Sequence, residues 1–600
     1  MTKSRNVLGL RLGPGHDTGA AIVSEIDGEL RCVAIAEERL SREKSSRKFP
    51  ENSIKACLSE FGLNPNQLDA IVFEKTVWSH GAEWYEQIPG PEWAYFNDPK
   101  EHAFFGSVGN VPCYYANHHL LHAAMAWHNT RWPEDGEPGC LLVIDGRGST
   151  WKDGAGCEGG SLHDFEPVYL NGKERWQLKK VDHSAETQSV FVGRGRSIER
   201  VDVSLRSGIG FFYAWLTECV LGFDHMHAGK SMGLAAYGDL NRTRFLEFPD
   251  EIMSGIDTDL TEFIYQSSNK GLDFLRRLDE DPTDPYFADA AAWGQCMLSR
   301  AVMHLTRHAI SRTGARRLGY AGGVALNVVA NRQIHDELLG EELDDFFVQP
   351  AASDAGLAMG AALLGYYEIL GGEAPFQTNQ VYLGPTVSTD YSTEALIAQG
   401  GQVPKNLISD VADLLLDNKI VGWFQGRSEH GPRALGARSI LCWPRAEWMK
   451  DHLNATVKHR EAFRPFAPIV QEEHASEIFD ADFPVPYMLL NTMVQESHRR
   501  MIPAVTHADG SGRLQTVARD RTPQLYELLG EIRARDGVGV LLNTSFNDNA
   551  EPIVETCHDA INCFNSTNID ALVCGEALLC KEPRGTTHPE GTAGNMACSN

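Results

Sequence analysis

Short apolar stretches that run directly into glycine-rich turns recur along this chain, and they constrain its fold more than any other feature. The first unit covers residues 7–23, VLGLRLGPGHDTGAAIV, where two apolar runs flank a turn rich in glycine. A similar unit covers residues 140–149, CLLVIDGRGS, where an apolar run enters Asp-Gly-x-Gly. Such runs predict strands, and two similar strand-and-turn units in one chain predict a duplicated α/β lobe.

A third glycine turn follows the apolar residues 318–321 and leads into a stretch of helical character. Gly322 and Gly323 carry no side chain, so we expect backbone amides there to approach a bound cofactor closely. A further strand is predicted at residues 346–350, and the helix after it would be capped by Ser353 or Asp354.

Breaker residues at 371–379, GGEAPFQTN, predict a domain boundary. Beyond it we expect a second α/β domain, with strands at 420–424 and 538–542 and helices near 525–534 and 558–565. Residues 243–292 are interpreted as a surface excursion because they include an acidic, proline-containing run. The expected divisions are 1–370, a linker at 371–384, the second domain at 385–583 and a flexible tail at 584–600.

The net charge of −27 would repel a phosphate backbone, which argues against nucleic acid as a partner. No apolar run reaches the roughly 18 residues that span a bilayer, and the N-terminus does not resemble a signal sequence. We therefore expect a cytoplasmic protein with no membrane partner. The thirteen cysteines include no C-x-x-C pair, so reduced structural thiols are predicted.

Two histidines, His118 and His122, are spaced so that both rings lie on one face of a helix. Alone, such a pair is more often an ordinary core or surface feature. Two carboxylates strengthen the case, since Asp145 ends a strand before a glycine turn and Asp354 begins a helix after a strand. Two imidazoles with two carboxylates suit iron or manganese acting as a Lewis acid. Turn formation remains the alternative role for Asp145, and helix capping the alternative for Asp354.

The second domain carries a concentration of cations in an otherwise acidic chain. Guanidinium groups bind phosphates through two parallel hydrogen bonds, and a lysine adds a mobile charge for a phosphoryl group in transfer. Salt bridges to Glu429 and Glu461 are the alternative. The sequence Asn543-Thr-Ser-Phe-Asn547 offers amide and hydroxyl groups beside a predicted strand, or forms an ordinary turn. The cationic residues are Arg427, Arg433, Arg438, Lys458, Arg460 and Arg464.

A Walker-type NTPase is excluded, because Gly229-Lys-Ser231 resembles a P-loop end but Asp224 stands where its first glycine should be. Several further motifs span most of the chain. They are GHD at 15–17, EERLSR at 37–42, HHLLH at 118–122, VIDG at 143–146, GKSMGLAAYG at 229–238, GGVALN at 322–327, QPAASD at 349–354, GPRALG at 431–436, KHRE at 458–461, FRPFAP at 463–468 and LNTSFN at 542–547. Taken together, these motifs resemble the nodulation-protein-U and cephem carbamoyltransferase family of natural-product O-carbamoyltransferases, including the nebramycin carbamoyltransferases.

The resemblance implies duplicated lobes of the actin-like ATPase superfamily, similar to the tRNA threonylcarbamoyl transferase, followed by a YrdC-like α/β domain. It implies that ATP, with Mg²⁺, and carbamoyl phosphate form carbamoyl-adenylate in the YrdC-like domain. The first domain then passes the carbamoyl group to a hydroxyl of a small molecule at an Fe²⁺-type centre. Adenylation makes sense chemically because it gives a poor electrophile AMP as a leaving group.

The resemblance also implies roles for individual residues. His118, His122, Asp145 and Asp354 would be the metal ligands. The residues implied to hold the carbamoyl and adenylate phosphates are Arg433, Lys458, Arg464, Arg513, Asn543 and Ser545. Arg513 belongs to the motif HADGSGRLQ at 507–515, in which Ser511 replaces the family's usual threonine and Gly512 is smaller than usual.

The acceptor hydroxyl needs a base, for which His16 or Asp17 is the first candidate and Asp239 a further one. Two other functions remain open, a tRNA-modifying threonylcarbamoyl enzyme and a sugar kinase on actin-like lobes. The motifs do not select an acceptor among aminoglycosides, cephems, macrolactams, Nod-factor sugars and guanidinium toxins. A homodimer is expected.

Overall fold

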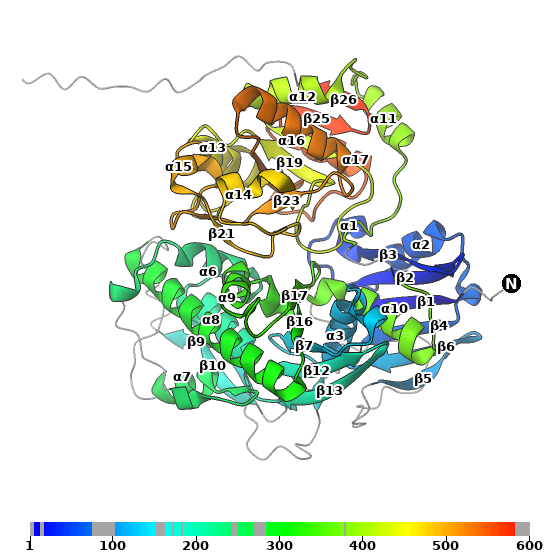
Figure 1. Ribbon diagram of the computed structural model, residues 1–600, viewed down its shortest axis with the longest axis vertical. Helices are drawn as coiled ribbons and strands as arrows, with labels where there is room; N and C mark the ends of the chain where they lie inside the picture. The colour runs from blue at the N-terminus through cyan, green and yellow to red at the C-terminus, as the bar shows by residue number, and fades with distance from the viewer. Residues whose placement is uncertain are drawn as a thin grey trace, which may run out of the picture.

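The chain is described by a computed structural model that covers residues 5–12, 17–74, 102–151, 162–170, 173–181, 184–242, 250–268, 284–376 and 380–581. The expected base His16 and the expected tail lie outside these residues. Three main sheets organise the molecule, with the third above the other two (Figure 1). The fold is therefore mixed α/β, as predicted.

The first sheet has the strand order β3-β2-β1-β4-β6-β5. β1 to β3 form an antiparallel meander, and β4 and β6 then join β1 in parallel. Its strands are β1 (Asn6–Arg11), β2 (Gly19–Ile26), β3 (Glu29–Ala36), β4 (Ala70–Glu74), β5 (His102–Val108) and β6 (Val111–Ala116). Helices α1 (Glu37–Ser41) and α2 (Glu51–Glu60) lie beside it.

The second sheet repeats this arrangement in the order β13-β12-β7-β16-β17. Again three antiparallel strands are followed by two parallel ones, and the first strand in the chain lies in the middle. The duplication predicted from the two glycine turns is thus confirmed in the topology. The strands are β7 (Gly139–Ile144), β12 (Gln188–Arg194), β13 (Ser197–Ser204), β16 (Arg317–Ala321) and β17 (Asp345–Val348).

Two helices fill the space between these sheets, α3 (His118–His128) and α10 (Leu357–Leu364). Glycines allow their close contact, because a Cβ at Gly360 would overlap the carbonyl of Leu121 and one at Gly356 would overlap Met125. On its other side α10 packs against β1, where a Cβ at Gly9 would overlap the backbone of Ala358. The positions of α3 and α10 are therefore fixed by backbone packing.

The other face of the second sheet is covered mainly by α8 (Pro285–Thr313). Phe287 and Ala291 on its first turns are fully buried, so the surface excursion predicted for 243–292 is wrong over 285–292. Asp284 caps this helix by accepting from Tyr286 N, so the last two residues of the acidic run start the helix, while residues 243–249 and 269–283 lie outside the described residues. Other helices here are α4 (Trp132–Asp135), α5 (Ile209–Trp215), α6 (Ala228–Ala235), α7 (Leu260–Ser268) and α9 (Val328–Leu338). The remaining strands are the antiparallel pair β9 (Leu162–Leu170) and β10 (Lys173–Val181) and the two-residue strands β8 (Thr150–Trp151), β11 (Ser184–Ala185), β14 (Met253–Ser254) and β15 (Asp257–Thr258).

The third sheet has the order β23-β20-β24-β19-β18-β25-β26. Its strand β24 starts at Leu541, three residues later than predicted, because Val538 and Gly539 turn to donate to Asp536. The strands are β18 (Val421–Phe424), β19 (Arg438–Cys442), β20 (Ala467–Gln471), β23 (Gln515–Val517), β24 (Leu541–Ser545), β25 (Ala571–Cys574) and β26 (Ala577–Cys580), and β21 (Thr492–Met493) pairs with β22 (Ser511–Gly512). The helices are α11 (Thr389–Ile397), α12 (Leu407–Leu416), α13 (Met449–Leu453), α14 (Ala475–Ile478), α15 (Glu496–Arg499), α16 (Pro523–Asp536) and α17 (Cys557–Ser566).

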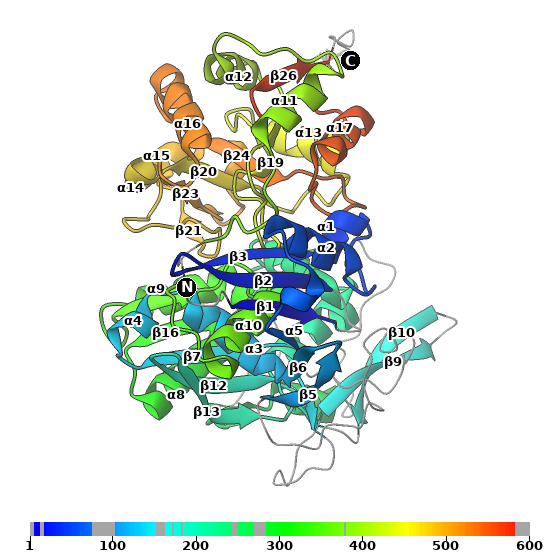
Figure 2. The ribbon, with the colours of Figure 1, turned by 90° about the vertical axis from the view of Figure 1, so that its right-hand side faces the viewer.

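The third sheet unit lies above α1 of the first (Figure 2), and charged side chains in and just after α1 make contacts between the two. Arg42 donates to Ile553 O at 2.8 Å and to Glu551 Oε2 at 3.0 Å. Arg39 donates to the carbonyls of Glu429 and Gly431. No helix in the described part of the chain is long and apolar enough to cross a membrane.

Candidate functional site

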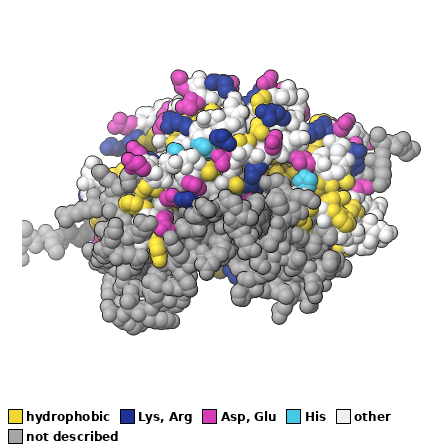
Figure 3. Space-filling model, turned by 90° about the horizontal axis from the view of Figure 1, so that it is seen from below, with side chains coloured by type: hydrophobic (Ala, Val, Ile, Leu, Met, Phe, Trp, Pro, Cys, Tyr) yellow, Lys and Arg dark blue, Asp and Glu magenta, His cyan; other side chains and the backbone are white. Residues whose placement is uncertain are grey.

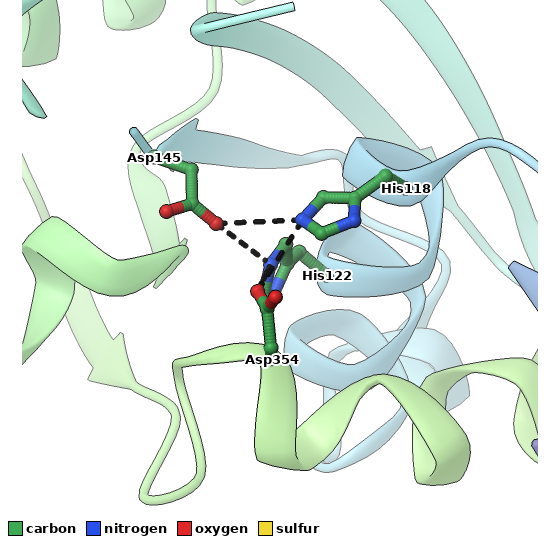
Figure 4. A group of neighbouring side chains, drawn as sticks. All are labelled: His118, His122, Asp145 and Asp354. Atoms are coloured by element: carbon green, nitrogen blue, oxygen red, sulfur yellow. Dashed lines mark hydrogen bonds and ion pairs between the residues drawn. The ribbon is translucent and has the colours of Figure 1, made fainter. Parts of the chain in front are cut away.

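The structure brings His118, His122, Asp145 and Asp354 together between the first two sheets (Figure 4). His118 Nε2 lies 3.4 Å from Asp145 Oδ2 and 3.4 Å from Asp354 Oδ1. His122 Nε2 lies 3.2 and 3.7 Å from the same two oxygens. Atoms bound to one ion at about 2.1 Å would stand roughly 3.4 Å apart in a tetrahedral arrangement. The cluster therefore has the spacing of a metal centre.

Local structure explains why these four side chains meet. His118 and His122 lie one turn apart on α3, whose start is capped by Asn117 through its acceptance from His119 N and Leu120 N. Asp145 directly follows β7, and Asp354 opens the short turn before α10. The histidines thus come from one helix, and the carboxylates from the ends of two elements that flank it.

The alternative roles of the two carboxylates can now be compared. Asp354 does not cap α10, and Ser353 makes no capping hydrogen bond either, so the predicted cap is wrong. Asp145 does form the turn, since its Oδ1 accepts from Gly146 N at 2.7 Å. Its Oδ2 still faces both histidines, so the turn and the cluster use different oxygens.

Opposite charges hold the cluster ionised. Burial alone would lower the pKa of His118, but the carboxylates of Asp354 and Asp145 outweigh it and raise that pKa to about 9. Burial would raise the pKa of Asp145, but hydrogen bonds from His118 and His122 lower it. Two imidazole nitrogens and two carboxylate oxygens are a donor set that fits Fe²⁺ or Mn²⁺ with further positions open.

The candidate bases lie apart from one another. Asp17 has a left-handed backbone with φ of 59° and lines a small cavity of about 60 Å³ together with Glu38 and Ser353. Ser353 and Ala355 of its lining flank Asp354 in the chain, but none of the four cluster residues lines this cavity. Asp239 is not in the cluster, and its carboxylate accepts from the Asn241 backbone and side chain in a local turn.

A second polar site is a cavity of about 620 Å³ bounded by both halves of the chain. One wall comes from α6, α8 and α9, and the other from the third sheet and its loops. Four guanidinium groups line the second wall, those of Arg433, Arg460, Arg464 and Arg513. Such a wall suits an anionic ligand with several phosphate groups.

These guanidiniums face one another with little negative charge nearby. Burial, together with Arg464, lowers the pKa of Arg433 to about 10, and burial with the same neighbour lowers the pKa of Arg460 to about 9. Burial and the other three guanidiniums lower the pKa of Arg513 well below its usual range. One of the predicted salt-bridge partners, Glu461, lies 3.9 Å from the Arg464 guanidinium. Its carboxylate also accepts a hydrogen bond from Lys230 Nζ at 2.6 Å.

Two of the predicted anion-binding arginines have another role. Arg438 donates to the carbonyls of Gln425, Gly426 and Glu555 and stacks over Phe424. Arg427 donates to the carbonyls of Gly384, Cys32 and Leu383. Both side chains are thus used by backbone acceptors, and the prediction that they bind anions is wrong.

Lys458 is enclosed by protein oxygens. Its Nζ lies 2.7 to 3.2 Å from the carbonyl and side-chain oxygens of Ser545 and Asn547. Asn543 and Ser545 line the cavity, and Asn543 Nδ2 also donates to Ala434 O and Gln515 Oε1. Lys458 therefore stabilises the cavity wall through these hydrogen bonds, and it would have to break one of them to bind an anion.

The two expected amide donors are not both available. Gly322 N already donates to Ala352 O at 2.9 Å, so this amide is used within the protein, and a cofactor role for Gly322 stays a prediction. Its φ of 93° and its contact with the Ile144 carbonyl, which a Cβ would overlap, explain the glycine. Gly323 lies beside Asp145, where a Cβ would stand 3.0 Å from Oδ1.

Sequence reasoning missed two residues of the metal cluster's surroundings, Arg11 and Glu74. Arg11 Nη2 donates to Asp354 Oδ2 at 2.7 Å, and Glu74 Oε2 lies 3.1 Å from His118 Nδ1. The sequence offers one sign of them: each is a charged residue at the end of an otherwise apolar strand.

Two family models match this chain. The carbamoyltransferase N-terminus model matches residues 6–97 and 107–363, and the carbamoyltransferase C-terminus model matches residues 412–581. The chain belongs to the carbamoyltransferase family, so the resemblance drawn from its motifs is confirmed and the protein is a transferase.

Curated relatives include nodulation proteins. Nodulation protein NolNO of Sinorhizobium fredii is 35% identical over 96% of this chain and 80% of its own length. Nodulation protein NolO of Bradyrhizobium diazoefficiens is 39% identical over 70% of this chain and 78% of its own. Among solved structures, HypF of T. kodakarensis is 13% identical, with a TM-score of 0.36, over 61% of this chain and 48% of that one.

Proposed function

We propose that this carbamoyltransferase is ATP-dependent and transfers its carbamoyl group to a hydroxyl of a small molecule in natural-product biosynthesis. The observation that carries the proposal is the presence of two separate polar centres on one chain, a histidine-carboxylate cluster and an arginine-lined cavity. Two centres suit a reaction in two halves, one that activates the carbamoyl group and one that transfers it.

The first half-reaction belongs in the arginine-lined cavity. Water hydrolyses carbamoyl phosphate to carbamate and phosphate, and a carbamate oxygen then attacks the α-phosphorus of ATP and expels pyrophosphate. Phosphate groups of both co-substrates would be held by Arg433, Arg464 and Arg513, with the side chains of Asn543 and Ser545 on the same wall. Mg²⁺ would accompany ATP. The expected product is carbamoyl-adenylate.

The second half-reaction belongs at the histidine-carboxylate cluster. His118, His122, Asp145 and Asp354 would hold Fe²⁺ or a similar divalent ion, which when bound polarises the carbamoyl oxygen. The acceptor oxygen attacks the carbamoyl carbon, AMP leaves, and the hydroxyl proton passes to a base. Asp17 is the described candidate for that base, and it lies in the cavity beside Ser353.

The division of the chain follows the same scheme. We assign the transfer half-reaction to residues 1–370, as duplicated actin-like lobes, which the shared strand order of the two sheets supports. We assign adenylate formation to residues 385–583, as a YrdC-like domain joined through 371–384. A tRNA substrate gains no support from the described part of the face in Figure 3, where acidic and basic side chains are interspersed.

The first experiment omits any acceptor. Purified protein is incubated with labelled ATP, carbamoyl phosphate, Mg²⁺ and Fe²⁺, and the products are separated. AMP and pyrophosphate that appear only with carbamoyl phosphate would support the proposal, whereas ADP would favour a kinase. In matched variants under the same acceptor-free conditions, His118→Ala should keep adenylate formation, while Arg513→Gln should lose it.

A further inference from the structure

A buried pair of opposite charges contacts two of the four residues in the histidine-carboxylate cluster. Arg11 ends β1 and Glu74 ends β4, and these strands are parallel neighbours with Leu10 opposite Phe73. The two side chains therefore leave the sheet at the same edge. They are 4% and 1% exposed, and the Arg11 guanidinium contacts Glu74 Oε1.

Glu74 determines which nitrogen of His118 carries the proton. Its Oε2 lies 3.1 Å from His118 Nδ1, and a carboxylate can accept a hydrogen bond but cannot donate one. In the neutral ring the proton is therefore on Nδ1, and the lone pair of Nε2 faces Asp145 and Asp354. This is the tautomer that can bind a metal.

Arg11 orients the carboxylate of Asp354 in a similar way. Its Nη2 donates to Asp354 Oδ2 at 2.7 Å, which leaves Oδ1 facing His118 and His122. Because the guanidinium is planar and rigid, one side chain fixes the relative positions of Asp354 and Glu74. Arg11, Glu74, His118 and Asp354 thus form a closed ring of contacts.

His122 provides a contrast within the same cluster. Its Nδ1 is buried and has no hydrogen-bond partner among the described residues. Within the cluster, the side chains that Glu74 and Arg11 hold in place are therefore those of His118 and Asp354.

Charge balance points in the same direction. When both imidazoles are neutral, as metal binding requires, Arg11 contributes one positive charge and Glu74, Asp145 and Asp354 contribute three negative ones, which leaves a net charge of −2 in a buried region. A divalent cation would balance that charge, whereas without Arg11 an uncompensated negative charge would remain. Buried charges are stable only when they are paired.

We propose that Arg11 and Glu74 are positioning residues that preset Asp354 and His118 for a divalent metal. This inference rests on the metal centre of the proposed function. The expected effect of losing either residue is a 10- to 100-fold weaker metal affinity, which is roughly the range for groups that orient metal ligands.

The test uses full-length protein and Co²⁺ alone, with affinity from titration against a chelator and ligand geometry from the visible absorption of bound Co²⁺. Glu74→Gln keeps the shape of the side chain but presents an amide donor to either Arg11 or the His118 N–H. We expect weaker Co²⁺ binding and an altered spectrum. Arg11→Lys is the second variant, because an ammonium group has no rigid fork to hold both carboxylates.

The control is Glu37→Gln, which changes a carboxylate that is 2% exposed in the same lobe and accepts from Ser53 and Asn52. It should lower the melting temperature without changing the Co²⁺ spectrum. Equal Co²⁺ affinity and spectra in wild type, Glu74→Gln and Arg11→Lys would overturn the positioning role alone. A loss of Co²⁺ affinity in Glu37→Gln as large as that in Glu74→Gln and Arg11→Lys would also overturn it. A wild-type protein that binds no Co²⁺ would overturn the metal centre and this inference together.

Discussion

Arg433 and Arg513 lie half-buried on one cavity wall, and the described residues offer no carboxylate within salt-bridge distance of either. Repulsion between them and their neighbours opposes folding until an anion arrives. We therefore expect Arg513→Met to leave the melting temperature of the anion-free protein unchanged or raised. The same variant should bind pyrophosphate about 10- to 100-fold more weakly, because charge-assisted hydrogen bonds are lost.

Thermal shift with increasing pyrophosphate measures both effects. The control is Arg445→Met, since Arg445 donates to Asp536 O outside the cavity and its loss should lower stability without changing the pyrophosphate response. A marked fall in the melting temperature of anion-free Arg513→Met would contradict the repulsion argument.

His128 is a second residue whose charge state affects stability. It is 2% exposed and stacks on Tyr367 with ring centroids 4.3 Å apart. Burial, with a smaller effect of Arg196, lowers its pKa from 6.5 to about 3. Between pH 6.5 and about 3 the unfolded chain binds a proton that the folded chain does not, so stability falls as the pH is lowered through this window.

We expect His128→Phe, which keeps the ring stacking, to reduce that loss by an amount on the order of a few kcal/mol at the acid end. Melting temperatures of both proteins between pH 7 and 4 provide the measurement. Parallel curves for the two proteins would show that His128 does not contribute to the acid sensitivity.

At the scale of elements, the contact between α3 and α10 sets the geometry of the histidine-carboxylate cluster. Gly360→Ala would place a Cβ against the Leu121 carbonyl, so α10 has to move away from α3. Asp354, just before α10, would move away from His118 and His122. We expect a stability loss of roughly 1–3 kcal/mol, as for other overpacked sites, and weaker Co²⁺ binding.

The matched control is Gly530→Ala in α16, where a Cβ would meet only the end of the flexible Gln471 side chain. Alanine is the better helix former there, so this variant should be slightly more stable and bind Co²⁺ normally. Normal Co²⁺ binding by Gly360→Ala would mean that the spacing of α3 and α10 does not set the geometry of the histidine-carboxylate cluster.

Elements could be predicted where a local pattern determines them. The histidine pair was visible because its spacing matches one helical turn, and the strands because their apolar runs end at glycines. The start of α8 was misread because proline and acidic residues suit both a loop and a helix N-terminus. Arg427 and Arg438 were misassigned because a sequence shows charge but not the backbone carbonyls that will surround it. Arg11 and Glu74 were missed because only parallel pairing of β1 with β4 makes them neighbours.

At the scale of the whole molecule, the arginine-lined cavity has walls from both halves of the chain. One wall includes Val328, just after the turn of residues 323–326 that starts beside Asp145. A carbamoyl-adenylate formed on the opposite wall would therefore face the part of the chain that also holds the histidine-carboxylate cluster. Carbamoyl-adenylate is a mixed anhydride that water hydrolyses, so we expect it to be consumed within the chain that made it.

Mixing two inactive variants tests this expectation. His118→Ala should form the intermediate but not transfer it, and Arg513→Gln should transfer but not form it. If the intermediate stays within one chain, an equal mixture should regain only a few per cent of the wild-type transfer rate, even though AMP is released at the rate of the first variant. Wild type diluted with the Arg513→Gln variant controls for loss of activity on mixing. A mixture that approaches the rate of the same amount of wild type would mean that the intermediate diffuses freely between molecules, and the shared cavity would then have no role in protecting it.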